Sequence, residues 1–373
     1  MKQIHGYFFL FCLVILVIQC GQKRNDEQES KSIKSTYTLG SFKEVQKIDT
    51  HVHFNSNSTI MIDLAKEYNF QLLNISVGFG DWNGVDRQLE VRQNHFHSFP
   101  ETIPYCTAFS MEGWDEEGWE NMVIERLRRD FEKGALGVKI WKNIGMEIRD
   151  KNGDLIFISD ERFDPIFQFI EDQGKVLLSH AGEPKNCWLP LDSMTVKNDY
   201  NYFKAHPQYH MYKHPDLPSY EDQIAHRDKM LSKHPNLKFI GVHMASLEWS
   251  VDRLSAFLDR FPNASVDLAE RVSHTQYQSQ RDREKVRDFF IKYQDRILYA
   301  TDFQHNPDTD EAAFQEYMME TWMNDWKYFN TDQMIQVPQL DEPVQGLALP
   351  KQVVDKIYRL NALKIFPEFS TNN

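Results

Sequence analysis

The sequence has few cysteines, no excess of positive charge and no glycine-rich phosphate loop. Cys12 and Cys20 fall in an apolar N-terminal stretch, and Cys106 and Cys187 are too few for a disulfide framework. Cys106 lies in an apolar, strand-like stretch, so we expect a buried free thiol there. The formal net charge of -13, without a basic stripe, argues against nucleic acid as a partner.

The N-terminal residues have the pattern of an export segment. Lys2 precedes an apolar run over residues 7–18, which is shorter than the roughly 20 apolar residues that span a bilayer. Cys20 follows this run and resembles the acylated cysteine of a bacterial lipoprotein, although Gln19 is not the usual small residue. We therefore expect residues 1–20 to be a lipoprotein signal peptide, with a plain signal peptide or a membrane anchor as alternatives.

On this interpretation the protein is exported and is held in the bacterial cell envelope by a lipid on Cys20. Residues 21–43 are polar and have no hydrophobic period, which predicts a flexible tether between the anchor and the rest of the chain. The sequence does not determine the oligomeric state, and a small-molecule substrate is the one partner that we expect besides the membrane.

From residue 44 to residue 373, short apolar runs alternate with amphipathic stretches. The full sequence is 41% hydrophobic, which is enough to fill a large core. Eight candidate strands predict an α/β fold of the (β/α)₈ TIM-barrel type, and the missing glycine-rich loop after the first strand disfavours a doubly wound open sheet. Two long segments, 182–219 and 326–349, interrupt the pattern. The first is rich in aromatic residues and follows the fifth strand, where we expect an inserted lid. The predicted strands cover residues 44–49, 70–77, 105–110, 135–141, 175–180, 238–243, 264–267 and 297–301.

Two histidines end the first predicted strand. Because side chains alternate along a strand, Asp49, His51 and His53 are expected on one face, and both imidazoles could bind one ion. His95 and His97 have the same spacing but lie in a predicted helix, where such side chains diverge, so we expect them on the surface.

Other metal-binding residue types end other predicted strands. His180 ends the fifth, His243 the sixth and Asp302 the eighth, so that all of them are expected at one rim of the barrel. A single histidine after an apolar strand is more often a satisfied core or rim residue. Four histidines and one aspartate at the same end of their strands favour a metal site.

In these residues the chain resembles the amidohydrolase superfamily, specifically the branch with aminocarboxymuconate-semialdehyde decarboxylase and pyrone-dicarboxylate lactonase. The resemblance runs from about residue 45 to residue 366, and the residues at 357–362, Ile-Tyr-Arg-Leu-Asn-Ala, resemble the closing helix of that branch. It implies that His51, His53, His180 and Asp302 hold a divalent ion.

The resemblance also implies roles for the remaining residues. His243 would be a further ligand or an acid/base group, and Asp302 would accept the proton of a water that attacks the substrate carbonyl. Imidazole and carboxylate ligands suit Zn²⁺ best, with Mn²⁺ or Fe²⁺ as alternatives. Lys139 resembles the fourth-strand lysine that some members carry in carboxylated form between two metals. We favour one ion, as is expected in this branch, and the alternative for Lys139 is a plain lysine paired with a carboxylate.

Three further residues are expected to contact the substrate: Arg271, Glu183 and Trp141. An arginine near the metal would suit a carboxylate-bearing substrate, although an ordinary salt bridge at the rim is an equal alternative. The leading hypothesis is a metal-dependent hydrolase of a small ester, lactone or amide. Its rivals are a non-oxidative decarboxylase on the same scaffold and a surface-exposed binding lipoprotein without catalytic activity.

Overall fold

The computed structural model describes residues 35–78, 80–98 and 103–371. The predicted signal peptide and the lipid-anchor residue Cys20 lie outside these residues. Within the described part of the chain, no helix combines the length and the apolar character that crossing a membrane would need.

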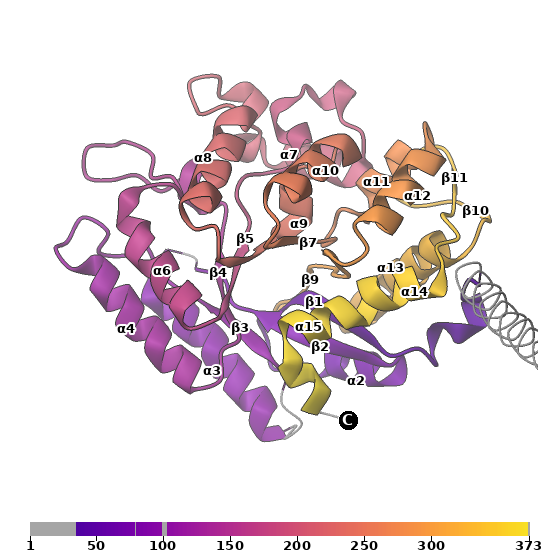
Figure 1. Ribbon diagram of the computed structural model, residues 1–373, viewed down its shortest axis with the longest axis horizontal. Helices are drawn as coiled ribbons and strands as arrows, with labels where there is room; N and C mark the ends of the chain where they lie inside the picture. Colours follow the sequence, from indigo (N-terminus) through magenta and orange to yellow (C-terminus); the bar gives the residue numbers. More distant parts are fainter. Residues whose placement is uncertain (1–34, 79, 99–102, 372–373) are drawn as a thin grey trace, which may run out of the picture.

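Nine parallel strands form one curled sheet, in the order β8-β7-β6-β5-β4-β3-β2-β1-β9 (Figure 1). Its two ends, β8 and β9, are pieces of one stretch of chain, and the residues between them bind β1 through Thr50 N to Tyr299 O (3.1 Å) and Asp302 N to His51 O (2.9 Å). The result is a TIM-barrel-like α/β fold. The strands are β1 (Lys47–Phe54), β2 (Phe70–Ile75), β3 (Tyr105–Ala108), β4 (Gly137–Ile140), β5 (Val176–Ser179), β6 (Lys238–Gly241), β7 (Ala264–Asp267), β8 (Ile297–Leu298) and β9 (Phe303–His305).

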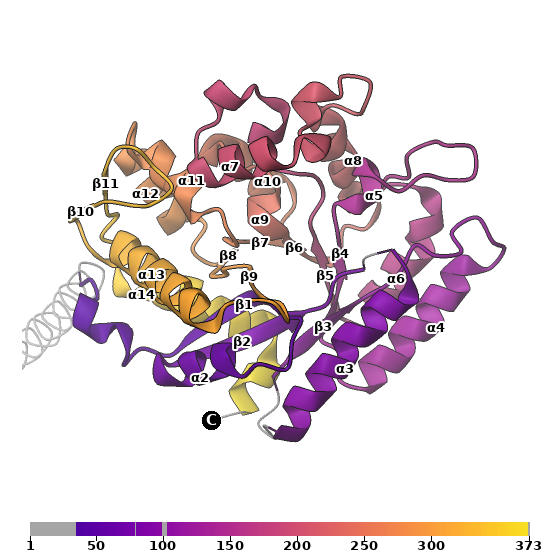
Figure 2. The ribbon, with the colours of Figure 1, turned by 180° about the vertical axis from the view of Figure 1, so that it is seen from behind.

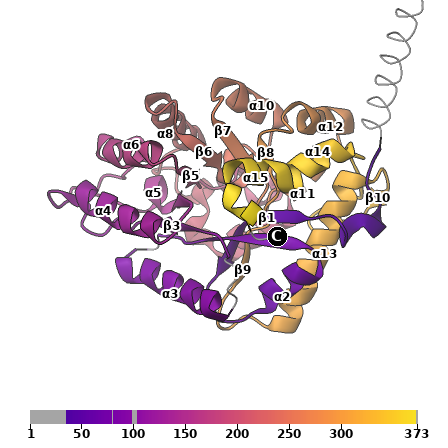
Figure 3. The same ribbon diagram turned by 60° about the horizontal axis from the view of Figure 1, so that its bottom comes forward.

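Helices surround this sheet, as the view in Figure 3 shows. Those outside the strands are α2 (Ile60–Glu67), α3 (Trp82–Ser98), α4 (Trp119–Glu132), α6 (Asp164–Asp172), α8 (Tyr220–Lys233), α10 (Val251–Arg260), α12 (Arg283–Lys292), α13 (Glu311–Asn330) and α14 (Lys351–Asp355). The last of these continues through the π-helical turn η7 (Lys356–Leu360) into α15 (Asn361–Ile365) and the 3₁₀ helix η8 (Pro367–Thr371). The local sequence explains several boundaries: a capping box of Ser219 and Asp222 begins α8, and Gly134 and Gly174, both with positive φ, follow α4 and α6.

Alternation along the strands separates two apolar clusters. Leu73, Leu178 and Ile240 belong to an interior cluster, which α15 and η8 cover through Ala362 and Phe369. Their neighbours in the sequence point outward into the larger cluster beneath the helices. Cys106 lies in the interior cluster as a buried free thiol, as predicted.

The predicted tether is too long at its C-terminal end. Residues 39–42 form the 3₁₀ helix η1 (Leu39–Phe42), in which Phe42 is buried against Phe70 and Trp326. Tyr37 also contacts the ring of Trp326 and donates a hydrogen bond of 2.7 Å to Asp355. These aromatic side chains bury enough apolar surface to hold residues 37–42 against the rest of the fold. In the sequence they stand among polar residues and show no hydrophobic period.

The segment predicted as a lid is folded into short helices. It contains η3 (Lys185–Trp188), η4 (Leu191–Ser193), α7 (Lys197–Ala205), η5 (Pro207–Tyr209) and η6 (Met211–Lys213). Figures 1 and 2 place α7 at the same end of the sheet as α9 (Val242–Ala245) and α11 (Val272–Ser279), opposite the C-terminal α15. The same region includes α5 (Asn143–Met146) and η2 (Glu161–Phe163). The second long segment begins inside α13 and continues through the hairpin of β10 (Met334–Ile335) and β11 (Val344–Gln345).

Candidate active site

One cavity of about 440 Å³ opens at the carboxyl ends of the strands, and every residue that we predicted for metal binding, catalysis or substrate contact lines it. These residues are His51, His53, Lys139, Trp141, His180, Glu183, His243, Arg271 and Asp302. They come from six different strand ends, which the sheet brings together because parallel strands present their carboxyl ends at one edge.

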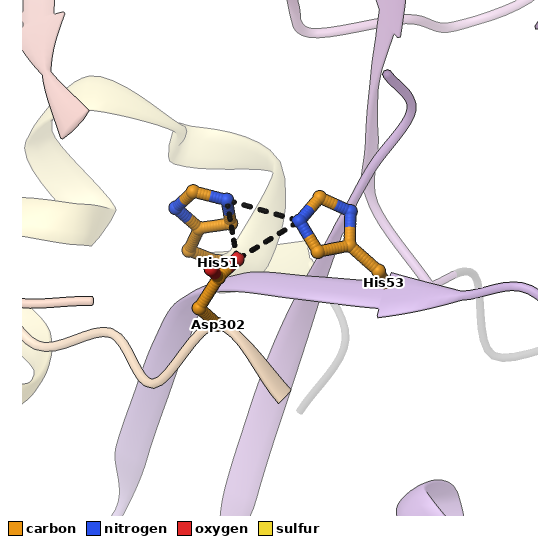
Figure 4. A group of neighbouring side chains, drawn as sticks. All are labelled: His51, His53 and Asp302. Carbon is orange, nitrogen blue, oxygen red and sulfur yellow. Dashed lines mark hydrogen bonds and ion pairs between the residues drawn. The ribbon is translucent and has the colours of Figure 1, made fainter. Parts of the chain in front are cut away.

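The centre of the cavity is a compact group of His51, His53 and Asp302 (Figure 4). The two Nε2 atoms lie 3.2 Å apart, and Asp302 Oδ1 lies 3.1 Å from His51 Nε2 and 2.9 Å from His53 Nε2. Asp302 has φ of 65°, a left-handed conformation directly after the predicted eighth strand, between β8 and β9. This turn directs the carboxylate toward the histidines.

The hydrogen bonds of the two imidazoles test whether this group suits a cation. His51 Nδ1 lies 3.0 Å from Asp267 Oδ2, and His53 Nδ1 lies 2.7 Å from the Ile75 carbonyl oxygen. With both rings neutral, these contacts place the proton on Nδ1, and the lone pairs of both Nε2 atoms then face each other and the Asp302 carboxylate. Three electron-rich atoms so close together fit a divalent cation as their common partner.

Asp267, at the end of β7, is the carboxylate that orients His51, whereas Asp49, which was expected on the same face as the histidines, contacts neither imidazole. Asp49 bonds the Thr301 hydroxyl at 2.6 Å and accepts from the His51 backbone N–H, so it stabilises the β1 and β8 strand ends. The expected shared face of Asp49 and the histidines is wrong because the pairing of β1 with β2 is irregular between Asp49 and Val52. A carboxylate at the end of the seventh strand was the available signal for Asp267.

His180 and His243 form a second pair beside this group, with ring centroids 4.2 Å apart. His180 Nε2 is buried and has no hydrogen-bond partner among the described residues, as expected of an atom reserved for a ligand or substrate. His243 Nδ1 lies 2.9 Å from the Ala269 carbonyl oxygen, which leaves its Nε2 as an acceptor, 3.9 Å from Asp302 Oδ2.

A left-handed turn without glycine sets the position of His243. All four residues from His243 to Ser246 have φ of 56–57°, a conformation that costs roughly 1–2 kcal/mol for each non-glycine residue. The His243 N–H donates to Asp267 Oδ1 at 2.7 Å, and the Ser246 hydroxyl donates to the Gly182 carbonyl at 2.7 Å. Gly241 permits the turn, since a Cβ there would lie 2.5 Å from the Ala245 Cβ. Asp267 thus orients both His51 and His243.

Burial and charge keep these groups in the forms that bind cations. Burial holds the pKa of His180 and of His243 well below the usual range, so both rings are neutral. Burial alone would raise the pKa of Asp302, but the charge and hydrogen bond of His51, together with the hydrogen bond of His53, hold it well below the usual range. The site therefore offers His180 and His243 as neutral imidazoles and Asp302 as an ionised carboxylate. Burial by itself would lower the pKa of His51, but Asp302 and Asp267 raise it, so a cation at this site competes with a proton on His51.

Lys139 lies beside the central group, with Nζ 3.2 Å from His51 Nε2. Its side chain is buried, and burial lowers its pKa to about 8. Because its pKa is lowered, Lys139 loses its proton more readily, and is more readily modified, than a lysine on the surface. The position matches the one predicted from the fourth strand.

The predicted substrate contacts line the same cavity. Arg271 is buried, and its Nε has no partner among the described residues, while NH1 lies 3.6 Å from the Glu270 carboxylate. Glu183 forms an ion pair with Lys142, whose ammonium also lies 5.6 Å from the Trp141 ring centroid. Arg271 is thus a buried cation with one N–H group that can donate to a ligand.

Sequence reasoning missed several residues that line the same cavity: Lys142, Asp199, Tyr202, Glu270 and Tyr317. Lys142 and Glu270 each follow a strand end by a few residues, which was a usable signal. The others come from α7 and α13, whose approach to the cavity depends on tertiary packing.

The prediction that His95 lies on the surface is wrong. His95 lies in α3, as predicted, but it is buried rather than exposed. Its ring centroid is 5.1 Å from that of Phe54, and its Nε2 lies 3.2 Å from the Ser58 carbonyl oxygen. It occupies the helix face that packs on β1, away from the cavity.

Residues 48–367 match the model of the family described as amidohydrolase. This chain belongs to the amidohydrolase family. It is an enzyme of that type, and the family typically binds divalent metals, in agreement with the candidate site of His51, His53 and Asp302. Among curated proteins, none matches the chain significantly.

Solved structures similar to this amidohydrolase share little sequence with it. One is 4-oxalomesaconate hydratase from Rhodopseudomonas palustris, at 12% identity over 87% of this chain and 97% of that chain, with a TM-score of 0.45. Another is an amidohydrolase from Pseudomonas aeruginosa, at 12% identity over 89% and 99% of the two chains, with a TM-score of 0.43. A D-hydantoinase matches at 16% identity over 62% of this chain and 47% of its own, with a TM-score of 0.36.

Proposed function

We propose that this amidohydrolase hydrolyses a C–O or C–N bond in a small, carboxylate-bearing ester, lactone or amide, and that it uses one divalent ion, preferably Zn²⁺. The observation that carries the proposal is the convergence of the Nε2 atoms of His51 and His53 on Asp302 Oδ1, at 3.1 and 2.9 Å. His51, His53, His180 and Asp302 would hold the ion. When bound, it supplies a positive charge that polarises the substrate carbonyl and makes a nearby water more acidic.

Asp302 and His243 are the proposed proton carriers. Asp302 Oδ2 faces His243 Nε2 at 3.9 Å, too far for a direct hydrogen bond, so both groups can act on a molecule placed between them. Asp302 accepts the proton of the attacking water. Neutral His243 offers a lone pair at Nε2, so it takes over the water proton that Asp302 has accepted and delivers it to the leaving group.

Arg271 is the proposed anchor for the substrate carboxylate. A buried guanidinium with an unused N–H favours a hydrogen-bonding, anionic partner, because a buried N–H without an acceptor is costly. Glu183 and Trp141 would shape the same end of the cavity, with Glu183 holding Lys142 in place. We propose Lys139 as an unmodified neighbour of one ion rather than a carboxylated bridge between two.

The finer architecture belongs to the same proposal. β8 and β9 together would be the eighth strand of a complete (β/α)₈ barrel, and residues 182–219 would be a lid. Supporting this, Asn198, Asp199, Tyr202 and Phe203 of α7 line the cavity. Export, with a lipid on Cys20, stays part of the proposal.

Metal analysis of the purified protein, followed by a substrate panel, tests the proposed function. We expect about one equivalent of zinc or manganese, lost in the His51→Ala/His53→Ala double variant and retained in His95→Ala. The latter removes a buried histidine outside the cavity and is therefore a control for general damage.

The panel compares esters, lactones and amides with and without a free carboxylate, and measures both acid release and CO₂. Acid release that depends on metal and on the substrate carboxylate supports the proposal. Release of CO₂ would instead indicate the decarboxylase. Two equivalents of metal would make Lys139 a bridging ligand, and no metal after loading would exclude the mechanism.

A further inference from the structure

A second, smaller cavity of about 180 Å³ adjoins the active-site cavity. It is bounded by α11, by α13, by the turn that precedes Asp302 and by residues 337–339 after β10. These elements lie together in both views of the molecule (Figures 1 and 2). The two cavities share Asn198, Glu270 and Tyr317, so they are separated by the thickness of these side chains.

The lining of this second cavity differs in charge from that of the first. The active-site cavity is lined by three basic side chains, Lys139, Lys142 and Arg271, whereas the described residues place no lysine, arginine or histidine around the second one. Its polar side chains are carboxyls, amides and hydroxyls, and an anionic ligand would find no counter-charge there. They are Glu270, Glu320, Asp325, Asn198, Gln276, Asn324, Gln339, Ser273, Thr301, Thr321 and Tyr317.

Gln276 indicates that the cavity is built for a ligand. Its side chain is only 2% exposed, yet its Nε2 has no hydrogen-bond partner among the described residues. A buried amide N–H without a partner costs about 1–3 kcal/mol, and such groups in native proteins usually have a purpose. It requires an acceptor, while the carboxyls of the same cavity require donors.

We propose that the second cavity is a subsite for an uncharged, hydroxyl-rich group, such as the polyol or sugar portion of a substrate. A hydroxyl is both donor and acceptor, so neighbouring hydroxyls satisfy carboxylates and Gln276 at once. A cation would satisfy the carboxylates but could not accept from Gln276. The ring of Tyr317 adds an apolar surface for the C–H faces of such a group.

The size and position of the cavity make it part of a larger site. At about 180 Å³ it is smaller than a typical ligand pocket of roughly 300–1,000 Å³ and suits a group of a few carbons. Glu270, in the shared wall, adopts φ of 53° and lies 3.6 Å from Arg271, which links the two cavities. The assignment of this hydroxyl-rich group to the substrate rests on the proposed function. The preference of the second cavity for hydroxyl groups does not rest on it, so the test measures binding without turnover.

Saturation-transfer NMR with the full-length protein tests the ligand chemistry, using meso-erythritol as the hydroxyl-rich probe and n-butylammonium as the cationic one. We expect saturable millimolar binding of erythritol and at least tenfold weaker binding of butylammonium. Thr321→Trp, which fills the cavity from α13, should abolish erythritol binding.

A matched pair of substitutions on the exposed side of α13 keeps the test independent of folding defects. Glu320 lines the cavity, whereas Glu316, one turn earlier and also exposed, does not. Glu320→Gln should weaken erythritol binding at least threefold, and Glu316→Gln should leave it unchanged. The inference is overturned by the absence of saturable erythritol binding, by tighter binding of butylammonium, or by equal effects of the two glutamate variants.

Discussion

Replacement of Asp267 by asparagine should uncouple His51 from the metal without removing any proposed ligand. Asp267 Oδ1 accepts the backbone N–H of His243 at 2.7 Å and of Ala269 at 3.3 Å, while Oδ2 lies 3.0 Å from His51 Nδ1. Asparagine has one oxygen, which two backbone donors will hold. Its NH₂ group then faces His51 Nδ1, which must become an acceptor, and the ring proton moves to Nε2.

The expected cost follows from this change of tautomer. A ring protonated at Nε2 cannot bind the ion through that atom, so binding requires rotation of the amide and loss of hydrogen bonds to the turn. Loss of such an orienting carboxylate typically weakens metal binding 10- to 100-fold, which is about 1.4–2.8 kcal/mol. We therefore expect a loss of this size for Asp267→Asn, with a parallel fall in activity.

Zinc affinity, measured by competition with a chromophoric chelator, provides the assay, and Asp49→Asn is the matched control. Asp49 bonds Thr301 and the backbone of His51 but neither imidazole ring, so its variant should change zinc affinity less than threefold. The reasoning would be refuted if Asp267→Asn kept its affinity while Asp49→Asn lost tenfold or more.

Four further outcomes are expected. Burial raises the pKa of Asp325 from 3.8 to about 7, so this group loses its proton at lower pH in the unfolded state than in the folded state. The free energy of unfolding should therefore fall as the pH rises from about 4 to 7, by up to about 4 kcal/mol. Asp325→Asn should make the free energy of unfolding, measured with urea at pH 5 and pH 8, less dependent on pH. Gly241→Ala should destabilise the fold by about 1–3 kcal/mol in the same assay, because its Cβ would meet Ala245. Phe42→Ala should cost about 3–5 kcal/mol, whereas no effect would mean that η1 is not anchored. Arg271→Gln should raise KM for a carboxylate-bearing substrate at least tenfold and leave that for its neutral analogue unchanged, and equal effects on both would contradict the assigned contact.

The strand ends explain why the residues of the candidate site could be found from the sequence. An apolar run followed by His180, by His243 or by Asp302 places each side chain at the carboxyl end of a parallel strand, and the fold allows those ends only one common edge. Strand alternation similarly placed His51 and His53 together. Residue type and strand period are local properties, so the sequence by itself determined the histidines and Asp302 at the centre of the site and the burial of Cys106.

Tertiary structure decided which groups orient and extend that site. The irregular pairing of β1 with β2 turned Asp49 away and left Asp267 as the partner of His51. The left-handed turn after Gly241 has no signature beyond that glycine, and the burial of His95 and Phe42 depends on partners distant in the sequence. The second cavity exists only where α11 and α13 meet, since its lining comes from five separate segments of the chain. Contacts between distant segments are set by packing of the whole chain, which no local period encodes.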